Sequence, residues 1–332
     1  MDLVTGATGL LGGNLVRALH AAGREVRILA RANSNTKCLN DLDGIHRAEG
    51  DITDPDSLRH AFQGIENVYH CAAMVSMWPA MDTQMNKVNV EGTRHVIEAT
   101  IASTAKRLIH CSSVDGIGLP EKGEPAADEN KAWNWDKLGF EMGYARTKFE
   151  SQKLVLQAAS QGRVDAVVVN PTYMFGAYDP KPSSGQMILE VAAGKAVGYT
   201  AGGNNFVDVE DVADAMIRAS TKGVTGEMYI LGGQNMTYQE IFSMIADVLK
   251  MPKPRFKIPY AMARIGGWAG DLNGLITRRE PNINTVTARL GYIDHYYEST
   301  KAITQLGMKQ SPIRGAIERA VDWFRREQYL PV

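Results

Sequence analysis

Short apolar runs rich in β-branched residues alternate with stretches of helical periodicity through the first half of the chain. The runs that predict strands are residues 2–5, 26–30, 45–49, 68–72, 108–112 and 166–170. Between the first two runs, Leu15, Leu19 and Ala22 recur at helical spacing, and Gly23 stands where a helix would end in a left-handed cap. This alternation predicts an α/β fold, in which a parallel sheet carries helices on both faces.

The strict alternation loosens after Pro171, where residues 178–185 read as a Pro/Ser/Gly-rich loop before a further helix. We therefore expect a first unit at residues 1–172, rejoined by 203–232, and a smaller C-terminal substrate lobe from 173–202 and 233–332. No internal repeat is visible.

Two helix starts in the second lobe are signalled by capping residues. Thr237 and Glu240 predict a capping box, and Ser311 and Pro312 predict a cap and a first-turn proline for the last helix.

Composition narrows the classes of function. The 332 residues carry a formal net charge of -1 with 22% charged residues, so no basic field attracts nucleic acid. Cys38, Cys71 and Cys111 have no CxxC spacing and fit neither a disulfide framework nor a zinc site, which favours a cytoplasmic location. The seven histidines show no ligand spacing, so no metal is predicted.

No membrane-spanning or secretory segment is expected. The most apolar stretch, residues 260–276, is interrupted by Arg264, Asp271 and four glycines and falls below the ~20 apolar residues a span needs. The first strand is predicted to begin at the start of the sequence, which leaves no room for a signal-peptide pattern before it.

A glycine-rich turn, TGATGLLG at Thr5–Gly12, follows the first predicted strand and precedes a helix. Glycines at such a turn let the backbone approach a pyrophosphate, which the helix N-terminus then stabilises. We expect cofactor contacts from Gly6, Thr8, Gly9, Leu10 and Leu11. A tight turn without a ligand is the alternative, but the strand-turn-helix context favours the binding motif.

The end of the second strand predicts the cofactor type. Arg31 stands where NAD-binding chains place a carboxylate for the ribose 2′-hydroxyl, and its charge suits the 2′-phosphate of NADP(H). A solvated surface arginine is the alternative reading. Asp51 and Ile52, after the third strand, are candidate adenine contacts, although Asp51 also fits a turn before a helix that begins with Thr53, Asp54 and Pro55.

Tyr144 and Lys148 lie four residues apart in a predicted helix and therefore share one face. A nearby ammonium and an oxidised nicotinamide would lower the pKa of the phenol toward a value useful for proton transfer. Ser113, at the end of the fifth strand, could donate to a substrate oxygen and is preferred over Ser112. We expect Tyr144, Lys148 and Ser113 to be catalytic.

With these motifs the chain resembles the extended short-chain dehydrogenase/reductases over nearly its whole length. TGxxGxxG matches Thr5–Gly12, and the family's serine, tyrosine and lysine match Ser113, Tyr144 and Lys148. Further matches are Asn89 in NVEGT, the NPTYMFG run at 170–176 and FVDVEDVA at 206–213.

The resemblance implies a Rossmann-type doubly wound parallel sheet, with the NADP-binding domain as the first unit. It also implies that Ala72 and Ala73 line the cofactor, that Asn89 braces the active site, and that Pro171 and Thr172 lie near the carboxamide. Arg31, the apolar NPTYMFG run and a C-terminal pattern of Tyr297, Lys301, Leu306 and Trp323 make the chain most similar to the dihydroflavonol reductase and 3β-hydroxysteroid dehydrogenase-like branch.

Two loops predicted to overhang the nicotinamide are apolar. One holds Met74, Val75, Met77, Trp78 and Met81, and the other holds Trp133, Trp135, Leu138 and Phe140. Such side chains suit a hydrophobic substrate, or alternatively ordinary core packing under long loops. The expected substrate contacts are Met74, Ser76, Trp78, Ser113, Trp135 and Tyr173.

The sequence thus predicts an NADP(H)-dependent oxidoreductase that moves hydride between nicotinamide and a carbonyl or alcohol carbon of a hydrophobic small molecule. A sugar-nucleotide epimerase or dehydratase, and an NADP-sensing regulator without turnover, are the alternatives. As in relatives, helices at residues 86–104 and 143–159 could form the four-helix interface of a homodimer.

Overall fold

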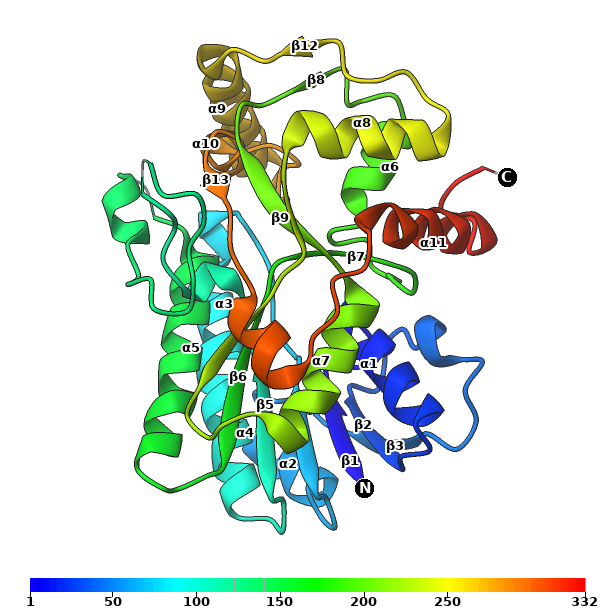
Figure 1. The fold of residues 1–332 in the computed structure, drawn as a ribbon, viewed down its shortest axis with the longest axis vertical. Helices are drawn as coiled ribbons and strands as arrows, with labels where there is room; N and C mark the ends of the chain where they lie inside the picture. The colour runs from blue at the N-terminus through cyan, green and yellow to red at the C-terminus, as the bar shows by residue number, and fades with distance from the viewer. Residues whose placement is uncertain (122, 140, 332) are drawn as a thin grey trace.

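A computed structural model describes residues 1–121, 123–139 and 141–331. Seven strands form one parallel sheet in the order β10-β6-β5-β4-β1-β2-β3 (Figure 1). They are β1 (Asp2–Thr5), β2 (Val26–Ala30), β3 (His46–Glu49), β4 (Asn67–His70), β5 (Arg107–Cys111), β6 (Ala166–Pro171) and β10 (Met228–Leu231). The six predicted strands and the doubly wound Rossmann-type fold are confirmed, and β10 extends the sheet by a strand that was not predicted.

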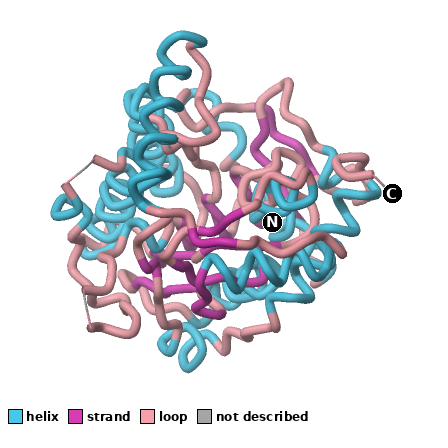
Figure 2. The backbone as a smooth tube through the Cα atoms, turned by 90° about the horizontal axis from the view of Figure 1, so that it is seen from above, coloured by secondary structure: helices cyan, strands magenta, loops and turns pink. Residues whose placement is uncertain are grey.

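Helices cover both faces of this sheet, and in Figure 2 the strands lie in the middle of the molecule with helices around them. One face carries α1 (Leu10–Ala21) and α7 (Val209–Lys222); the other carries α2 (Pro55–Ala61), α4 (Gly92–Ile101) and α5 (Gly143–Ser160). Successive strand residues enter opposite cores: Val167 and Val169 pack on the first side and Val168 on the second. This explains why the strands are almost continuously apolar.

The second lobe contains a four-stranded sheet made of β7 (Tyr173–Phe175), β9 (Gly203–Asp208), β11 (Gln234–Thr237) and β13 (Asp294–His295), and a small pair of β8 (Gly198–Tyr199) with β12 (Phe256–Lys257). Its helices are α6 (Gln186–Ala192), α8 (Tyr238–Leu249), α9 (Tyr260–Thr277), α10 (Thr285–Leu290) and α11 (Ile313–Arg326). Phe206, Ile241 and Trp323 belong to one buried core here.

The segment expected to return to the first unit, residues 203–232, is divided in the structure. β9 pairs with β7, β11 and β13 in the second sheet, whereas α7 and β10 join the large sheet. The return therefore begins at α7 rather than at residue 203.

Shorter elements connect these parts. They are α3 (Asp82–Met85), the 3₁₀ turns η1 (Lys37–Leu39), η2 (Pro79–Met81), η4 (Val114–Gly116) and η5 (Trp135–Leu138), and the π-helical segments η3 (Asn86–Glu91) and η6 (Ala302–Leu306).

The helix-end predictions can be compared directly with the structure. Gly23 follows α1 with φ +70°, and Thr237 and Glu240 form the expected capping box. The last helix differs by one residue, since Pro312 itself is the N-cap. Ser311 bonds instead to the Asp211 carboxylate through its amide and hydroxyl, which orients it away from the helix end.

Within the part of the chain that the structure describes, no helix is long and apolar enough to cross a membrane. The same residues contain no group of three or more histidine, cysteine or acidic side chains arranged to hold a metal ion.

Candidate active site

The three glycines of the turn after β1 differ in their surroundings. Gly6 has φ +70°, and a Cβ there would lie 2.6 Å from the Ala72 amide nitrogen. A Cβ on Gly12 would lie 2.2 Å from the Gly6 carbonyl oxygen. At Gly9 the nearest atom is the Gly6 oxygen at 3.5 Å, an ordinary contact. The first and third glycines are thus required for close packing, while Gly9 faces space that a ligand could fill.

The N-terminus of α1 begins at this turn. Its N-cap, Gly9, offers no side-chain hydrogen bond, so the first amides of the helix have no side-chain partner there. Leu10 and Leu11 have buried side chains and can meet a ligand only through their backbone, whereas Thr8 is partly exposed. Amides and helix dipole together suit the pyrophosphate of a dinucleotide.

Arg31 lies just after β2, exposed, with its guanidinium 3.8 Å from the Asp51 carboxylate. Asp51 also accepts bonds from the amide and hydroxyl of Thr53 at 2.9 Å each, the geometry of a turn residue. Arg47, which sequence reasoning missed, donates to the carbonyl oxygens of Arg31 and Ala32 at 2.8 and 2.9 Å. A second guanidinium therefore supports the backbone beside Arg31.

Ile52 does not line an open groove. Its side chain is buried, and a Cβ on Gly92 would lie 2.7 Å from its Cδ1. The side chain thus packs between the third strand and α4.

The loop after β4 is held from two sides. The Ala72 amide donates to the Thr5 hydroxyl at 3.2 Å, and Ala73 beside it is exposed. Asn89, in the π-helical segment η3, accepts from the Met74 amide at 2.7 Å and donates to the Met74 carbonyl and the Thr147 hydroxyl. Asn89 thereby joins this loop to α5, the helix that carries Tyr144.

Two residues at the end of β6 complete this edge of the sheet. Pro171 closes the strand, and the hydroxyl of Thr172 is buried without a hydrogen-bond partner among the described residues. A buried donor of this kind fits a ligand amide. With the open space at Gly9 and the uncapped helix, it makes these residues fit a nicotinamide dinucleotide.

Ser113, Tyr144 and Lys148 meet at the carboxyl end of β5. Ser113 caps η4 and donates its hydroxyl to Asp115 Oδ2 at 3.1 Å, whereas Ser112 is directed toward Gln152. Burial, and then the charge of Asp115, raise the pKa of Tyr144, and a hydrogen bond with Ser113 opposes this shift. The phenol is therefore protonated at neutral pH, but the raised pKa makes it a weaker acid than a free phenol.

Lys148 is bonded to the backbone of β5, and its expected effect on the pKa of Tyr144 together with an oxidised nicotinamide stays a prediction. Its ammonium donates to the Cys111 carbonyl at 3.0 Å and lies 6.0 Å from the centroid of the Tyr144 ring. Burial lowers the pKa of Lys148 itself. The ammonium thus lies at the end of β5, beside the Tyr144 ring.

Two further polar residues at this site were not predicted. Burial raises the pKa of Asp115 to about 6, with the Ser113 bond opposing the shift. Gln152 links α5 to the sheet through bonds with Ser112, the Gly116 carbonyl and Asn170. Gln152 follows Lys148 by four residues, so the helical spacing that identified Tyr144 and Lys148 could have identified it as well.

Much of the expected substrate region packs around Tyr144. Met74, Met77, Met81, Trp133, Trp135 and Leu138 share one apolar cluster with it. Trp135 is buried and donates its indole N–H to the Ile117 carbonyl at 2.8 Å. Trp133 stacks on Phe149, and Phe140 lies outside the described residues.

The remaining predicted substrate contacts lie in two places. Ser76 is buried and donates to the Glu280 carboxylate at 2.7 Å, and the Trp78 amide donates to the Ser76 hydroxyl at 3.1 Å. Tyr173 packs on Phe206 of the second lobe, and its hydroxyl donates to the Ser184 carbonyl. The structure thus keeps Ser76 near the Tyr144 cluster and turns Tyr173 toward the other core.

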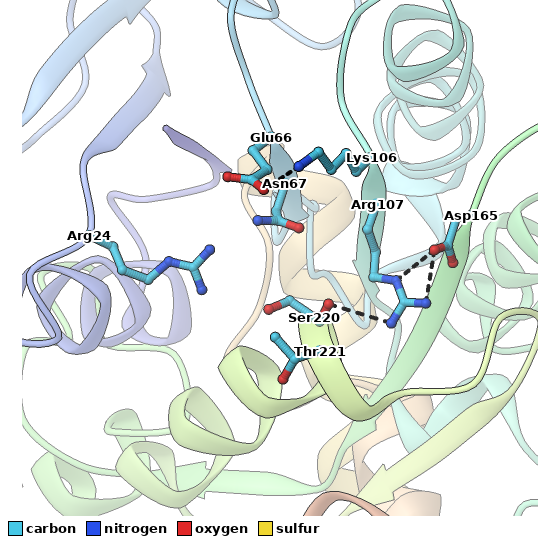
Figure 3. A pocket seen from close by; sticks show the side chains of 8 residues that line it. All are labelled: Arg24, Glu66, Asn67, Lys106, Arg107, Asp165, Ser220 and Thr221. Atoms are coloured by element: carbon cyan, nitrogen blue, oxygen red, sulfur yellow. Dashed lines mark hydrogen bonds and ion pairs between the residues drawn. The ribbon is translucent and has the colours of Figure 1, made fainter.

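A charged hollow of about 350 Å³ opens at the amino ends of the strands, opposite the site described above (Figure 3). It is lined by Arg24, Glu66, Asn67, Lys106, Arg107, Asp165, Ser220 and Thr221. Its cations are paired within the protein: Arg24 with Asp2 at 2.6 Å, Lys106 with Glu66 at 2.8 Å and Arg107 with Asp165 at 2.8 Å. Since ligands of open α/β sheets bind at the carboxyl ends of strands, we interpret this hollow as structural.

Comparisons with known proteins agree with this geometry. The model of the NAD dependent epimerase/dehydratase family matches residues 3–232. Sterol demethylase protein B of Methylococcus capsulatus is 35% identical over 97% of this chain and 98% of its own. A Synechocystis sp. protein, provisionally named dihydroflavonol 4-reductase, is 33% identical over 98% and 95%. The crystal structure of gox2253 superposes with a TM-score of 0.86 at 32% identity, covering 99% of each chain. The resemblance inferred from the motifs, including its narrower branch, is confirmed.

Proposed function

Because this chain belongs to the NAD dependent epimerase/dehydratase family, the extended short-chain dehydrogenase/reductases, we propose that it is an NADP(H)-dependent oxidoreductase acting on a carbonyl or alcohol carbon of a hydrophobic small molecule. The observation that carries the proposal is the meeting of Ser113, Tyr144 and Lys148 at the end of β5, within an apolar cluster. A sensor without turnover has no need of all three.

The preference for NADP(H) is supported by Arg31, the exposed cation after β2. Its charge can pair with a 2′-phosphate, and β2 ends at Ala30 without a carboxylate to hold the 2′-hydroxyl. The turn at Gly9 would hold the pyrophosphate, and the Thr172 hydroxyl would meet the carboxamide.

When bound, the cofactor supplies or accepts hydride. In the reducing direction Tyr144 donates its phenolic proton to the substrate oxygen. Ser113 hydrogen-bonds the same oxygen, and Lys148 holds the ribose hydroxyls while its ammonium remains bonded to Cys111. Met74, Met77 and Trp135, which share the apolar cluster of Tyr144, would pack beside a hydrophobic substrate.

The names of the relatives favour the same substrate class. A protein named for sterol demethylation and one named as a flavonoid reductase both indicate polycyclic, poorly water-soluble substrates. The methionines near Tyr144 could adapt to such a ring system.

The test is a panel of hydrophobic ketones and alcohols, with NADPH oxidation or NADP⁺ reduction followed by absorbance. Stoichiometric consumption of cofactor with at least one member supports the proposal. Turnover of a nucleotide sugar with tightly held cofactor and no net absorbance change would instead identify an epimerase.

We further propose that the chain forms a homodimer through η3, α4 and α5, which pack together on one face of the large sheet. Sedimentation velocity should show a dimer at micromolar concentration, and a monomer there would contradict the proposal.

Cys38, Cys71 and Cys111 are all free thiols in the structure, which supports action in the reducing cytoplasm.

A further inference from the structure

Helix α9 carries large apolar side chains on its solvent side. Six of them are more than half exposed, including Trp268 at 70% and Leu275 at 73%. The six are Met262, Ile265, Trp268, Leu272, Leu275 and Ile276. Their spacing of three or four residues places them on one face of the helix. Exposed single apolar residues are ordinary, but a continuous stripe is not.

Three glycines form much of the inward face of α9. A Cβ on Gly270 would lie 1.7 Å from the Ile283 carbonyl oxygen, and one on Gly267 would lie 3.0 Å from the Asn284 oxygen. Gly274 packs against Pro281 in the same way. The helix thus turns its smallest residues toward α10 and its largest apolar residues toward solvent, the reverse of an ordinary surface helix.

The stripe is flanked by positive charge. Residues 250–280 hold seven lysines and arginines and two acidic residues, a formal charge of +5 in a chain whose total is -1. Arg255 and Lys257 precede the helix, Arg278 and Arg279 follow it, and all four are exposed.

Both acidic side chains are hydrogen-bonded within the protein, although Glu280 is exposed. Asp271 accepts from Thr285, and Glu280 accepts from the Ser76 hydroxyl and the Met77 amide. The exposed cations around the stripe therefore outnumber the one exposed carboxylate of this segment, Glu280.

From this combination we propose that α9 is an interfacial helix that docks the protein on the surface of an anionic lipid bilayer. An apolar face containing a tryptophan enters the boundary between headgroups and acyl chains, and the flanking cations pair with lipid phosphates. In Figure 1, α9 stands at the end of the molecule opposite the amino terminus, so the large sheet would lie away from the membrane.

Docking would bring the bilayer close to the region around Tyr144. The segment between α9 and α10 contacts the loop after β4, since Glu280 bonds to Ser76 and Asn284 donates to the Met77 carbonyl at 2.9 Å. Met77 belongs to the apolar cluster of Tyr144. A hydrophobic molecule dissolved in the membrane could thus reach this loop without crossing bulk water.

The first measurement is co-sedimentation of the full chain with vesicles of phosphatidylcholine alone or mixed with phosphatidylglycerol. We expect binding to the mixed vesicles that weakens with added salt. Replacing Ile265, Trp268 and Leu272 together by serine should weaken binding at least about tenfold. The matched control replaces Val224 and Ile303, exposed apolar residues outside α9, by serine and should bind like wild type.

The role of the flanking cations and the insertion of Trp268 into the bilayer are tested separately. Arg278→Glu with Arg279→Glu should also weaken binding about tenfold or more, whereas Arg59→Glu on α2 should not. Trp268 is the one exposed tryptophan among the described residues, and its fluorescence should be quenched by brominated lipids. That quenching should disappear in Trp268→Phe.

Absence of wild-type binding to the mixed vesicles would overturn the proposal, as would undiminished binding by the triple serine variant. So would a dimer that the triple variant converts to a monomer, because a second copy would then cover the stripe. Retained NADPH binding and an unchanged melting temperature confirm that each variant is folded. Since vesicle binding needs no substrate, this result and the test of the oxidoreductase activity can fail independently.

Discussion

The Arg31 guanidinium lies 3.8 Å from the Asp51 carboxylate, across the carboxyl ends of β2 and β3. Both groups are solvent-accessible, so the pair contributes little to stability. Its importance is for the cofactor, because a carboxylate beside Arg31 partly offsets the charge offered to a 2′-phosphate.

We predict tighter binding of NADPH than of NADH, and loss of this preference in Arg31→Ala. The lost charge-assisted contact should weaken NADPH binding about tenfold to a hundredfold and leave NADH nearly unchanged. Asp51→Asn should tighten NADPH binding about threefold by removing the competing charge. Fluorescence titration of both cofactors measures this, and equal affinities that neither substitution alters would remove the basis for the NADP assignment.

Gly9→Val should abolish cofactor binding in a folded protein. Gly9 has φ -103° and no close neighbour, so the fold tolerates a side chain that would occupy the place of the pyrophosphate. Gly12→Val is the contrasting variant, which should fail to fold because its Cβ would collide with the Gly6 carbonyl. Circular dichroism and NADPH titration separate the two outcomes. Micromolar NADPH binding by folded Gly9→Val would make the turn purely structural.

Tyr144→Phe should slow hydride transfer by about 10²–10⁴-fold, the range for a lost general acid, with NADPH binding close to wild type. The ring keeps its packing while the proton donor is removed. Lys148→Met should lower both cofactor affinity and rate. Stopped-flow kinetics with an accepted carbonyl, paired with NADPH titration, gives both quantities. A Tyr144→Phe rate within about threefold of wild type would exclude Tyr144 as the acid.

The Asp115 carboxyl predicts a pH dependence. Its pKa in the folded chain is about 6, raised by burial from 3.8. Below pH 6 the protonated carboxyl can donate to Ser113, which leaves the serine proton for the substrate oxygen. Carbonyl reduction should therefore accelerate as the pH falls through 6, and this step should vanish in Asp115→Asn. A wild-type profile that is flat between pH 5 and 7 would contradict the role, with ~pH 6 as the expected midpoint.

The same group affects stability with a defined sign. Because the folded pKa lies above the unfolded value, the contribution of Asp115 to stability is fully present below pH 3.8 and is lost as the pH rises through about 6. The difference in melting temperature between Asp115→Asn and wild type should therefore grow in favour of the variant between pH 3.8 and the folded pKa of about 6, and level off above it. Thermal melts across this range test the sign without any substrate.

Glu280 should act as a positioning residue for the loop after β4. Glu280→Ala removes the bonds to Ser76 and Met77, so we expect the substrate KM to rise about tenfold while NADPH affinity stays the same. Glu318→Ala, an exposed carboxylate on α11, is the control. Steady-state kinetics with an accepted substrate gives the comparison. A kcat loss without a change in KM would assign Glu280 a different role.

The sequence by itself determined the parallel sheet, the glycine turn and the spacing of Tyr144 and Lys148. These are local features: strand periodicity, the need for glycine at Gly6 and Gly12, and a four-residue helical repeat each depend on near neighbours in the chain. The family resemblance followed from the same short motifs.

Only the tertiary structure decided which residues distant in sequence interact electrostatically or lie on one surface. Asp51 comes to Arg31 because β2 and β3 are neighbours in the sheet, and Asp115 acts on Tyr144 because α5 packs against η4, which follows β5. The bond from the Lys148 ammonium to the Cys111 carbonyl likewise joins α5 to a distant strand. In the sequence, α9 is an apolar segment interrupted by charges and glycines. Its exposed apolar stripe is seen only in the structure, because the packing of its glycines against α10 determines which face meets solvent. These interactions depend on the distance between groups in space and on their burial, and neither follows from how far apart the residues are in the sequence.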